Sequence, residues 1–270
     1  GYPDMCFGIA VDAQGGICAV GCVGLWDGNR DWRVRKLQPN GSLAWEDTLS
    51  GPAELVDDAQ AVVIDAQGNP IVAGYSNHGT DNGAGANYDG VVIKYRGADG
   101  QRLWTRVLAG TPDRNDACYS VAVDGLGNPL VAGYYTDSRG IAIGYLARLS
   151  GADGSVLGEQ TWADEKDVIV YAVNYRGRAL ALAGTWNPGS TREFWVCKAL
   201  PPPPRITEFQ AVDSEQWRLR WVGQWEPGAV LSATSLLSPD WQTLASGLTA
   251  PEWIGPLPGP AARFHRVREP

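Results

Sequence analysis

Histidines are where a search for chemistry in this chain starts, because most proton-transfer and hydrolytic sites use one. His78 and His265 are the only two among 270 residues. A Ser-His-Asp or Cys-His set would have to use one of them, and two distant histidines with irregularly spaced cysteines do not indicate a zinc site. The HExxH, Cys-x-x-Cys, Walker and Gly-x-Ser-x-Gly motifs are missing from the sequence. We therefore assign no catalytic residue and expect no cofactor.

Aspartates recur along the chain at a fixed spacing. A catalytic site needs its carboxylate once, whereas a residue that returns in every repeat is typical of a structural role. We predict that these aspartates cap turns or link neighbouring repeats. They form two sets, eight residues apart, which are Asp4, Asp57 and Asp116, and then Asp12, Asp65 and Asp124.

Two loops offer oxygen ligands for calcium. Asp27, Asn29 and Asp31 stand at alternate positions, as at the start of a calcium-binding loop. The full loop would require glycine at its sixth position and glutamate at its twelfth, where this chain has Trp32 and Gln38. The alternative is that this segment is a polar hairpin loop that binds no metal. Calcium is the only metal that we expect could bind. The second set of oxygen ligands is Asp81, Asn82, Asn87 and Asp89.

An internal repeat supplies the elements that must position these residues. The stretch 12–21 (DAQGGICAVG) returns as 65–74 (DAQGNPIVAG) and 124–133 (DGLGNPLVAG), and a divergent fourth copy lies between Asn174 and Gly184. The closing glycines are spaced by 53, 59 and 51 residues. Such a period is typical of a four-stranded propeller blade rather than of a helical repeat.

Each copy predicts the same four strands, which we call a to d. A short Gly/Asn turn joins strand a to strand b, a longer loop leads to strand c, and an Asn-Gly or Asp-Gly turn leads to strand d. The fourth copy stops after strand c, so we predict an all-β propeller whose last unit lacks its outer strand. Strand a should be buried on both faces, because blades pack face to face. The predicted units are 4–56, 57–115, 116–166 and 167–200, and the strand a segments are 7–11, 60–64, 119–123 and 169–173.

The repeat resembles a known family at these residues. The succession of Asp-x-x-Gly-Asn, Val-Ala-Gly-Tyr, Val-Ile-Lys-Tyr, Asp-Gly and Leu-Trp within 65–104 is similar to the SBBP-type β-propeller repeat of bacterial surface and secreted proteins. The resemblance covers about residues 4–200 and implies radially packed blades that bind or scaffold, with no shared catalytic residue. Propellers of that family usually have more than four blades. The Gly-x-x-Leu-Trp stretch also resembles repeats of quinone-dependent dehydrogenases, but their cofactor residues have no counterpart here.

The loops between strands b and c are the predicted binding surface. They differ from copy to copy, whereas the a–b and c–d turns are short and nearly identical, and variable loops on a repeated scaffold often carry function. Strand parity places all b–c loops on one face and the tight turns on the other. Aromatic and amide side chains there suit a glycan or a protein surface, and loop packing is the alternative. The candidates are Trp26, Asp27, Asn29, Asn77, His78, Asp81, Tyr88, Tyr135, Asp137, Arg139, Trp186 and Asn187.

Two of the five cysteines are predicted to form a disulfide. If Asp12 lies opposite Gly16 in the a–b hairpin, Cys6 faces Cys22 at a separation that a disulfide spans. A change of one residue in the register would break this pairing, and five reduced core cysteines are the alternative. The cysteines expected to stay free and buried are Cys18, Cys118 and Cys197.

A second module follows the repeats. Residues 201–204 are four prolines, which indicate a stiff linker. Short alternating stretches with Gly/Pro turns in 205–270 predict a small β-sandwich. The turn 239–241 (PDW) and the closing strand 263–267 (RFHRV) resemble the fibronectin-III/Ig-like modules of secreted bacterial proteins, which implies spreading, docking or anchoring.

Composition narrows the partners and the compartment. The net charge of −8 argues against nucleic acid, and no apolar run is long enough to span a membrane. Since Gly1 is not an initiator Met and no apolar leader follows, we expect a processed chain or a fragment. We expect a secreted or cell-surface protein, either extracellular or periplasmic. Its expected partner is a protein or glycan surface.

The function predicted from these observations is a non-enzymatic binding or scaffold module. The first alternative is a propeller-type lyase or hydrolase acting on carbohydrate through loop carboxylates such as Asp81, Asp89 or Asp137. A glycoside hydrolase would need two of them ~5–10 Å apart in one cleft. The second alternative is a structural subunit, with the fourth blade completed by another chain, because native proteins avoid open strand edges.

Overall fold

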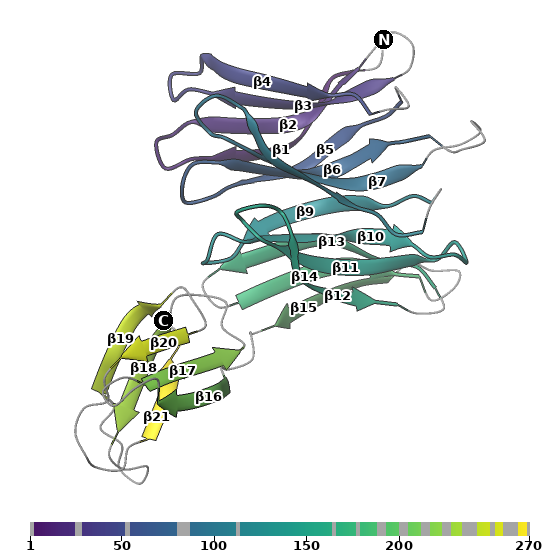
Figure 1. Ribbon diagram of the computed structural model, residues 1–270. Helices are drawn as coiled ribbons and strands as arrows, with labels where there is room; N and C mark the ends of the chain where they lie inside the picture. Colours follow the sequence, from purple (N-terminus) through teal and green to yellow (C-terminus); the bar gives the residue numbers. More distant parts are fainter. Residues whose placement is uncertain are drawn as a thin grey trace. The chain divides into compact units, whose positions relative to one another are not determined.

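The chain folds into β-strands throughout the part that the structure describes (Figure 1). This computed structural model describes residues 3–24, 29–51, 55–79, 87–111, 114–163, 166–176, 179–187 and 193–199, with side chains up to Cys197, and the backbone of six later strands. No helix occurs in these ranges, which confirms the all-β fold predicted from the repeat.

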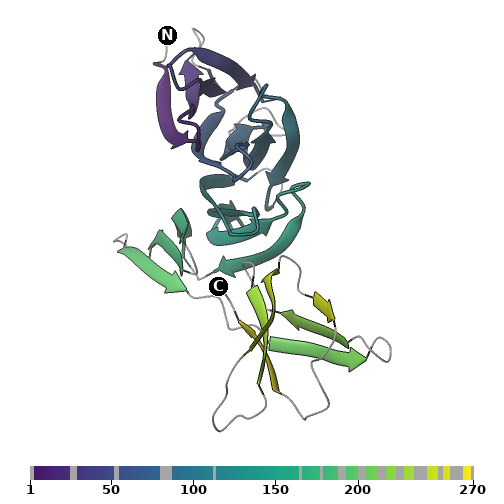
Figure 2. The ribbon, with the colours of Figure 1, turned by 90° about the vertical axis from the view of Figure 1, so that its left-hand side faces the viewer.

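The repeats form four successive antiparallel blades, seen as separate layers in Figure 2. The first three blades pair their four strands in chain order, and the fourth has three described strands, as predicted. Blade 1 contains β1 (Met5–Val11), β2 (Ile17–Gly24), β3 (Arg30–Leu37) and β4 (Leu43–Leu49). Blade 2 contains β5 (Asp58–Ile64), β6 (Pro70–Asn77), β7 (Tyr88–Tyr95) and β8 (Arg102–Leu108). Blade 3 contains β9 (Ala117–Val123), β10 (Pro129–Thr136), β11 (Ala142–Leu149) and β12 (Val156–Trp162), and blade 4 contains β13 (Val168–Arg176), β14 (Ala179–Trp186) and β15 (Glu193–Ala199).

Strand order gives each blade two different ends, as predicted. The a–b and c–d turns lie at one end, which we call the turn end and which is on the left of the blades in Figure 1. The b–c and d–a connections lie at the opposite end, which we call the loop end. The repeated turns and the variable loops are therefore separated by the full length of the strands.

A bulge in strand a explains the closing glycine of the repeat. In blade 1 the register shifts between Cys6 and Gly8, and the same shift occurs in blades 2 and 3. The bulge brings the strand a backbone so close that a Cβ on Gly21 would lie 1.9 Å from the Met5 carbonyl oxygen. Gly74 and Gly133 meet the same obstacle at 2.0 and 1.9 Å. Only glycine fits there, so the bulge requires the Val-Ala-Gly motif.

Tryptophans of strand d join blade 1 to blade 2 and blade 2 to blade 3. Trp45 stacks on Tyr95 of blade 2 with ring centroids 5.6 Å apart, and its Nε1–H donates to the Gly97 carbonyl oxygen at 2.9 Å. Trp104 repeats this on blade 3 by donating to the Gly151 carbonyl oxygen at 3.3 Å. Blade 3 has Gly158 at the corresponding position, and the sequence of blade 4 runs into prolines where the other blades have the c–d turn.

Each blade has a leading face, toward the preceding blade, and a trailing face, toward the following one. Val62 and Ile64 on the leading face of blade 2 pack into the first core cluster, and Val121 in blade 3 is 8% exposed. In contrast, Ile9 and Val11 on the leading face of blade 1 are 66% and 63% exposed. The prediction that every strand a is buried on both faces is therefore wrong for β1, and Tyr171 and Ala172 of β13 are exposed as well.

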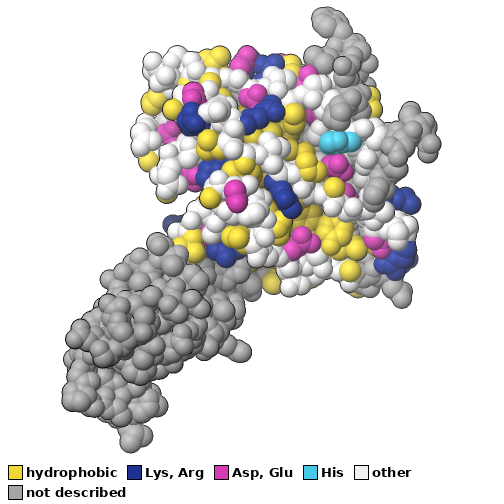
Figure 3. Space-filling view, viewed as in Figure 1, with side chains coloured by type: hydrophobic (Ala, Val, Ile, Leu, Met, Phe, Trp, Pro, Cys, Tyr) yellow, Lys and Arg dark blue, Asp and Glu magenta, His cyan; other side chains and the backbone are white. Residues whose placement is uncertain are grey.

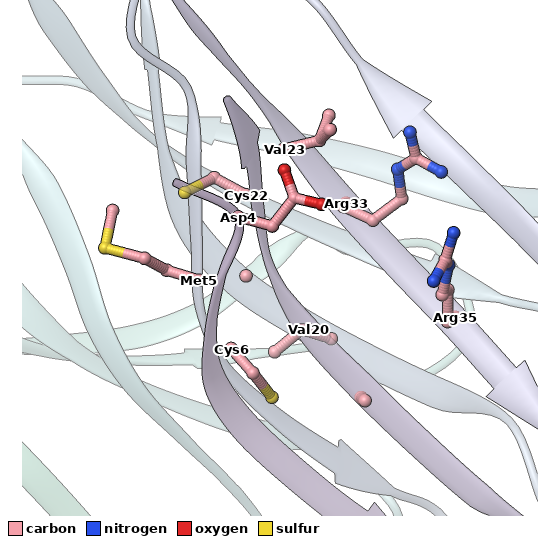
Figure 4. A pocket seen from close by; sticks show the side chains of 10 residues that line it. Asp4, Met5, Cys6, Val20, Cys22, Val23, Arg33 and Arg35 are labelled. Atoms are coloured by element: carbon pink, nitrogen blue, oxygen red, sulfur yellow. The ribbon is translucent and has the colours of Figure 1, made fainter. Parts of the chain in front are cut away.

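The predicted Cys6–Cys22 disulfide is wrong. Both thiols are free, and the bulge at Phe7 places Cys22 opposite Met5 and Cys6 opposite Gly21. A shift of one residue turns the two side chains to opposite faces of the sheet, and Figure 4 shows their sulfur atoms apart.

The three other cysteines are also free. Cys18 and Cys118 are buried as expected, and burial raises the pKa of each thiol to about 12. Cys197 was expected to be buried but is exposed. It lies on the leading face of blade 4, where blade 3 offers Gly158 instead of a strand d tryptophan.

The C-terminal residues form two three-stranded sheets, in agreement with the expected small sandwich. One sheet has the order β16-β17-β20 and the other β19-β18-β21. The closing strand predicted at 263–267 is β21 in the structure. The strands are β16 (Arg205–Ala211), β17 (Trp217–Val222), β18 (Gly228–Ala233), β19 (Gln242–Leu248), β20 (Glu252–Gly255) and β21 (Phe264–Arg268). The Pro239–Trp241 turn lies outside the described residues.

Candidate functional site

At the turn end, recurring aspartates hold the a–b turns. Asp65 Oδ1 accepts hydrogen bonds from two backbone N–H groups of its turn, at 2.9 and 2.8 Å, and its Oδ2 lies 2.8 Å from Lys94 Nζ. Asp12 makes the same contacts with its turn and with Lys36 of strand c. Asp124 also accepts from its turn. These contacts confirm the predicted capping role, so the turn end is built for structure.

At the loop end, the other set of aspartates ties loops to strands. Asp116 accepts hydrogen bonds from the backbone N–H groups of Gly110 and Thr136, at 2.6 and 2.7 Å. Asp57 makes the equivalent pair of bonds in blade 2, and Asp4 accepts one from the end of β2. Burial raises the pKa of Asp116 to about 6, although the two backbone hydrogen bonds oppose the shift. Because its exposure is 0%, this carboxyl is structural rather than available to a ligand.

The predicted b–c loop residues only partly form a surface. Trp26, Asp27 and Asp81 lie outside the described residues. Asn29 and Asn77 are 6% and 1% exposed. The Asn77 side-chain oxygen accepts hydrogen bonds from two backbone N–H groups of its own loop, at 2.9 and 3.3 Å. Asn77 therefore shapes the loop and does not face a ligand.

His78 and Tyr88 lie on the same b–c loop of blade 2. His78 Nε2 is 3.7 Å from Asp89 Oδ2, and the His78 side chain is 34% exposed. Tyr88 packs edge-on against Tyr75, with ring centroids 5.1 Å apart. Burial raises the pKa of Asp89, and the nearby His78 opposes that shift. His78 is thus the most accessible polar group of this loop in the described part of the chain.

The remaining candidates lie on blades 3 and 4. Tyr135 stacks on Tyr145, with ring centroids 5.8 Å apart, and is half-buried. Asp137 accepts hydrogen bonds from two backbone N–H groups of its loop and from Arg139 Nε at 2.8 Å. Trp186 is 37% exposed, and the Asn187 backbone N–H donates to the Asp167 carbonyl oxygen. The alternative of loop packing holds for most of this set.

The calcium prediction stays a prediction. Of its three ligands, Asp27 lies outside the described residues, and the Asn29 side-chain oxygen accepts the Arg30 backbone N–H at 2.7 Å. One oxygen of Asp31 is buried without a protein partner. Within the described ranges, no group of three His, Cys, Asp or Glu residues could hold a metal ion.

A polar pocket opens at the loop end of blades 3 and 4. Its volume is about 430 Å³. It is formed by strands b and c of blade 3, by the d–a connection before that blade and by the start of β13. Asp167 Oδ1 accepts the Ala142 backbone N–H at 2.9 Å, which holds this carboxylate at the wall. The pocket is lined by Arg114, Asn115, Tyr134, Thr136, Gly140, Ala142, Asp167 and Ile169.

Tyr134, which lines this pocket, belongs to a row of packed tyrosines. Tyr134 stacks on Tyr119, with ring centroids 5.9 Å apart, and Tyr119 contacts Tyr171 of blade 4 at 5.0 Å. Burial raises the pKa of Tyr119 and Tyr134, so both hydroxyls stay protonated and can donate as well as accept. Tyr171 is 39% exposed. The pocket therefore combines an aromatic wall with one cation, one carboxylate and an amide.

Sequence reasoning missed most of this pocket. Tyr134 follows the closing glycine of the repeat, and the repeat pattern assigns it to strand b. Arg114 and Asn115 lie in a d–a connection, which shares the loop end with the b–c loops. The parity argument that selected the b–c loops applies equally to the d–a connections and could have found both residues.

Comparisons with known proteins leave this chain without an assigned family. No family model matches it, and no curated protein matches it. Solved structures that resemble it include a putative exo-beta-1,3-galactanase from Bifidobacterium bifidum S17, with 8% identity, a TM-score of 0.37 and coverage of 79% of this chain and 80% of that one.

Two further structures come from viruses. The parainfluenza virus 5 hemagglutinin-neuraminidase ectodomain has 9% identity, a TM-score of 0.36 and coverage of 97% and 69%. The tail fiber of Staphylococcus aureus phage P68 has 9% identity, a TM-score of 0.27 and coverage of 92% and 74%. At these TM-scores the likenesses carry no functional argument, which rests on this chain's own residues.

No helix in the described ranges is long and apolar enough to cross a membrane. On the face seen in Figure 3, acidic and basic side chains are interspersed and do not form a basic stripe. This agrees with the net charge of −8.

Proposed function

We propose that the chain is a non-enzymatic binding module that holds a glycan at the loop end of blades 3 and 4. The pocket beside Tyr134 is the observation that carries this proposal. Its volume, about 430 Å³, is in the range of sites for small ligands. The turn end also has a pocket, of about 480 Å³, but its described lining contains no aromatic side chain.

The chemistry of the lining residues fits a saccharide. A sugar ring has a C–H face that packs on an aromatic ring and a rim of hydroxyl groups that donate and accept hydrogen bonds. Tyr134 supplies the ring and Arg114 and Asn115 the donors, while Asp167 supplies a fixed acceptor.

The hydrolase or lyase alternative finds less support in the described residues. It requires two accessible carboxylates in one cleft. Asp116 is fully buried, and Asp137 is engaged by its own loop and by Arg139. Asp89 belongs to the b–c loop of blade 2 and does not line the pocket that Asp167 lines. A binding role needs no such pair.

The family and location belong to the same proposal. The motifs of 65–104 support an SBBP-type repeat, and the two small sheets after the prolines support a fibronectin-III-like module. A secreted or surface protein that binds glycans would use such a module to dock or to extend the propeller. Calcium at Asp27, Asn29 and Asp31 also remains part of the proposal.

Binding to an array of oligosaccharides tests the function. The purified full chain should retain at least one oligosaccharide, and titration calorimetry should then give its affinity. Removing the aromatic wall with Tyr134→Ala should weaken binding by roughly tenfold or more, which is ~1.4 kcal/mol. Arg114→Ala should weaken it as well, because a charged donor is lost.

A matched control separates the site from general charge effects. Arg96 is an arginine of the turn end that pairs with Asp99, so Arg96→Ala should bind as the unchanged protein does. Failure to retain any oligosaccharide, or equal losses for Arg114→Ala and Arg96→Ala, would overturn the proposed function.

A further inference from the structure

The pocket beside Tyr134 is lined by two segments that are held in different ways. Arg114 and Asn115 belong to the d–a connection before blade 3 and lie outside its strands, whereas Thr136 is the last residue of β10. A strand is held by its ladder of backbone hydrogen bonds, but a connection needs other contacts to satisfy its polar groups and keep its place. Other contacts must therefore fix Arg114 and Asn115 beside Thr136.

The Asp116 carboxylate makes this connection. Asp116 follows Asn115 directly in the chain, and its Oδ1 accepts the Thr136 backbone N–H at 2.7 Å. Its Oδ2 accepts the backbone N–H of Gly110, near the start of the same d–a connection, at 2.6 Å. We call this pair of bonds the Asp116 clamp. It closes the connection into a loop and fastens the end of that loop to β10, and it uses both carboxylate oxygens.

Further hydrogen bonds converge on Asn115 and Asp116. The Asn115 carbonyl oxygen accepts a hydrogen bond from the Thr136 hydroxyl. The Asn115 Oδ1 accepts the Tyr88 backbone N–H at 3.3 Å, and the Asp116 backbone N–H donates to the Tyr88 carbonyl oxygen at 2.6 Å. This part of the pocket wall is therefore fixed between β7 of blade 2 and β10 of blade 3.

The Asp116 clamp changes when its carboxyl takes up a proton. A carboxylate accepts hydrogen bonds with both oxygens, whereas protonation turns one of them into an O–H donor. Asp116 has 0% exposure, so bulk water does not replace the hydrogen bond that is lost. Burial raises the pKa of this carboxyl to about 6, which places the change close to neutral pH.

The titratable groups that face Asp116 come from four strands of blades 2 and 3. Asp89 on β7 is charged, and its negative charge adds to the upward shift of the Asp116 pKa. His78 lies 3.7 Å from Asp89 and acts on Asp116 through that neighbour. The others stay neutral near pH 6, because burial raises the pKa of each; they are Cys118 on β9, Tyr134 and Tyr135 on β10, and Tyr145 on β11.

We propose that Asp116 is the positioning residue of the glycan pocket, and that the pocket holds its ligand less tightly once the Asp116 clamp takes up a proton. This inference rests on the proposed function. Asp116 acts through Arg114, Asn115 and Thr136, which line the pocket. Because the ligand favours the unprotonated carboxyl, its binding near pH 6 also releases a proton, as linkage requires.

Blade 2 supplies a matched control. Asp57 has 0% exposure and accepts an equivalent pair of bonds, from the Gly51 and Asn77 backbone N–H groups at 2.6 and 2.8 Å. Asn77 is the counterpart of Thr136, and neither Asn77 nor Gly51 lines the pocket beside Tyr134. Asp57→Asn therefore removes an equally buried anchor and leaves the walls of the pocket intact.

Titration calorimetry of the full chain between pH 5 and pH 8 tests the inference. The ligand is the best-retained oligosaccharide without ionisable groups, so that it does not titrate itself. The dissociation constant of the wild-type chain should rise roughly tenfold from pH 7.5 to pH 5, as expected for a required carboxylate with a pKa of about 6. Asp116→Asn should bind roughly tenfold more weakly at pH 7.5 and show no pH dependence. Asp57→Asn should keep the wild-type affinity and pH profile.

The wild-type profile needs no variant, so it tests the inference even where Asp116→Asn is unfolded. A wild-type affinity that does not change with pH overturns the inference and leaves the proposed function standing. A pH profile that persists in Asp116→Asn assigns the effect to His78 or Asp89 and also overturns it, as does an equal loss of affinity in Asp57→Asn. A chain that retains no oligosaccharide overturns the proposed function, and this inference with it.

Discussion

The turn end and the loop end of the blades differ in which side-chain contacts recur from one blade to the next. At the turn end, the same contacts return in each blade, as when Asp12 meets Lys36 and Asp65 meets Lys94. At the loop end, only the aspartate anchors return, and the side chains around them change from a buried Asn77 to a pocket beside Tyr134. Repetition therefore marks what holds the blades, and variation marks the surface that can differ between proteins of this architecture.

The largest effect is expected at the turn end. Lys94 is 8% exposed, pairs with the fully buried Asp65 carboxylate, and donates to the Gly151 carbonyl oxygen of blade 3. Lys94→Met would leave that charge unpaired and should cost about 3–5 kcal/mol of unfolding free energy. Urea unfolding measures this loss. Adding Asp65→Asn should recover part of it, and a loss below ~1 kcal/mol would show that the turn end does not hold the blades.

A smaller loss is expected between the two ends, at the strand b glycines. A Cβ on Gly74 would lie 2.0 Å from the Asp58 carbonyl oxygen, so Gly74→Ala should cost about 3 kcal/mol. Gly158→Ala is the matched change, because nothing lies within 4 Å of that Cβ position. Thermal unfolding of both variants should separate them. Equal midpoints would contradict the bulge as the reason for the repeated glycine.

A pH effect should report on the loop end. The pKa of Asp116 is about 6 when folded, above its ordinary value of 3.8. The folded chain therefore binds this proton more tightly than the unfolded chain does. The contribution of Asp116 to the free energy of unfolding grows as the pH falls through 6, and it is lost as the pH rises through 6. Between pH 7 and pH 5 the gain is about 1 kcal/mol. Urea unfolding of Asp116→Asn should lack this increment; the same increment in both proteins would rule out Asp116 as its source.

The smallest effect is expected from an exposed pair of the loop end. Arg139 bonds Asp137 at 2.8 Å, but the arginine side chain is 60% exposed. Arg139→Met should leave the urea midpoint unchanged within error, because exposed ion pairs add little stability. A clear fall in the urea midpoint would show that ion pairs at the loop end also stabilise the blades. That result would contradict the difference expected between Arg139 and Lys94.

The sequence predicted the blades well because their contacts are local and repeated. The Asp-x-x-Gly turns, the strand parity and the three described strands of blade 4 follow from the repeat pattern, as the capped turn at Asp65 shows. The register failed at one place. The bulge at Phe7 adds a residue that no turn signal announces, and it moved Cys6 away from Cys22.

The site was predicted less well, because a pocket depends on which strands lie side by side. Tyr134, Tyr119 and Tyr171 come from three different strands and two blades, and only the stacking of the blades brings them together. Asn77 was predicted to face a ligand, yet its amide closes its own loop. Residue type and loop position do not reveal whether a side chain points outward.

Hydrogen exchange with and without the oligosaccharide that binds best tests the central claim most directly. If the turn end holds the blades and the loop end binds, the ligand should slow exchange in residues 114–116 and 134–142. Exchange at the turns 12–16, 65–69 and 124–128 should stay the same. Slower exchange at those turns, with none at the loop end, would contradict the account.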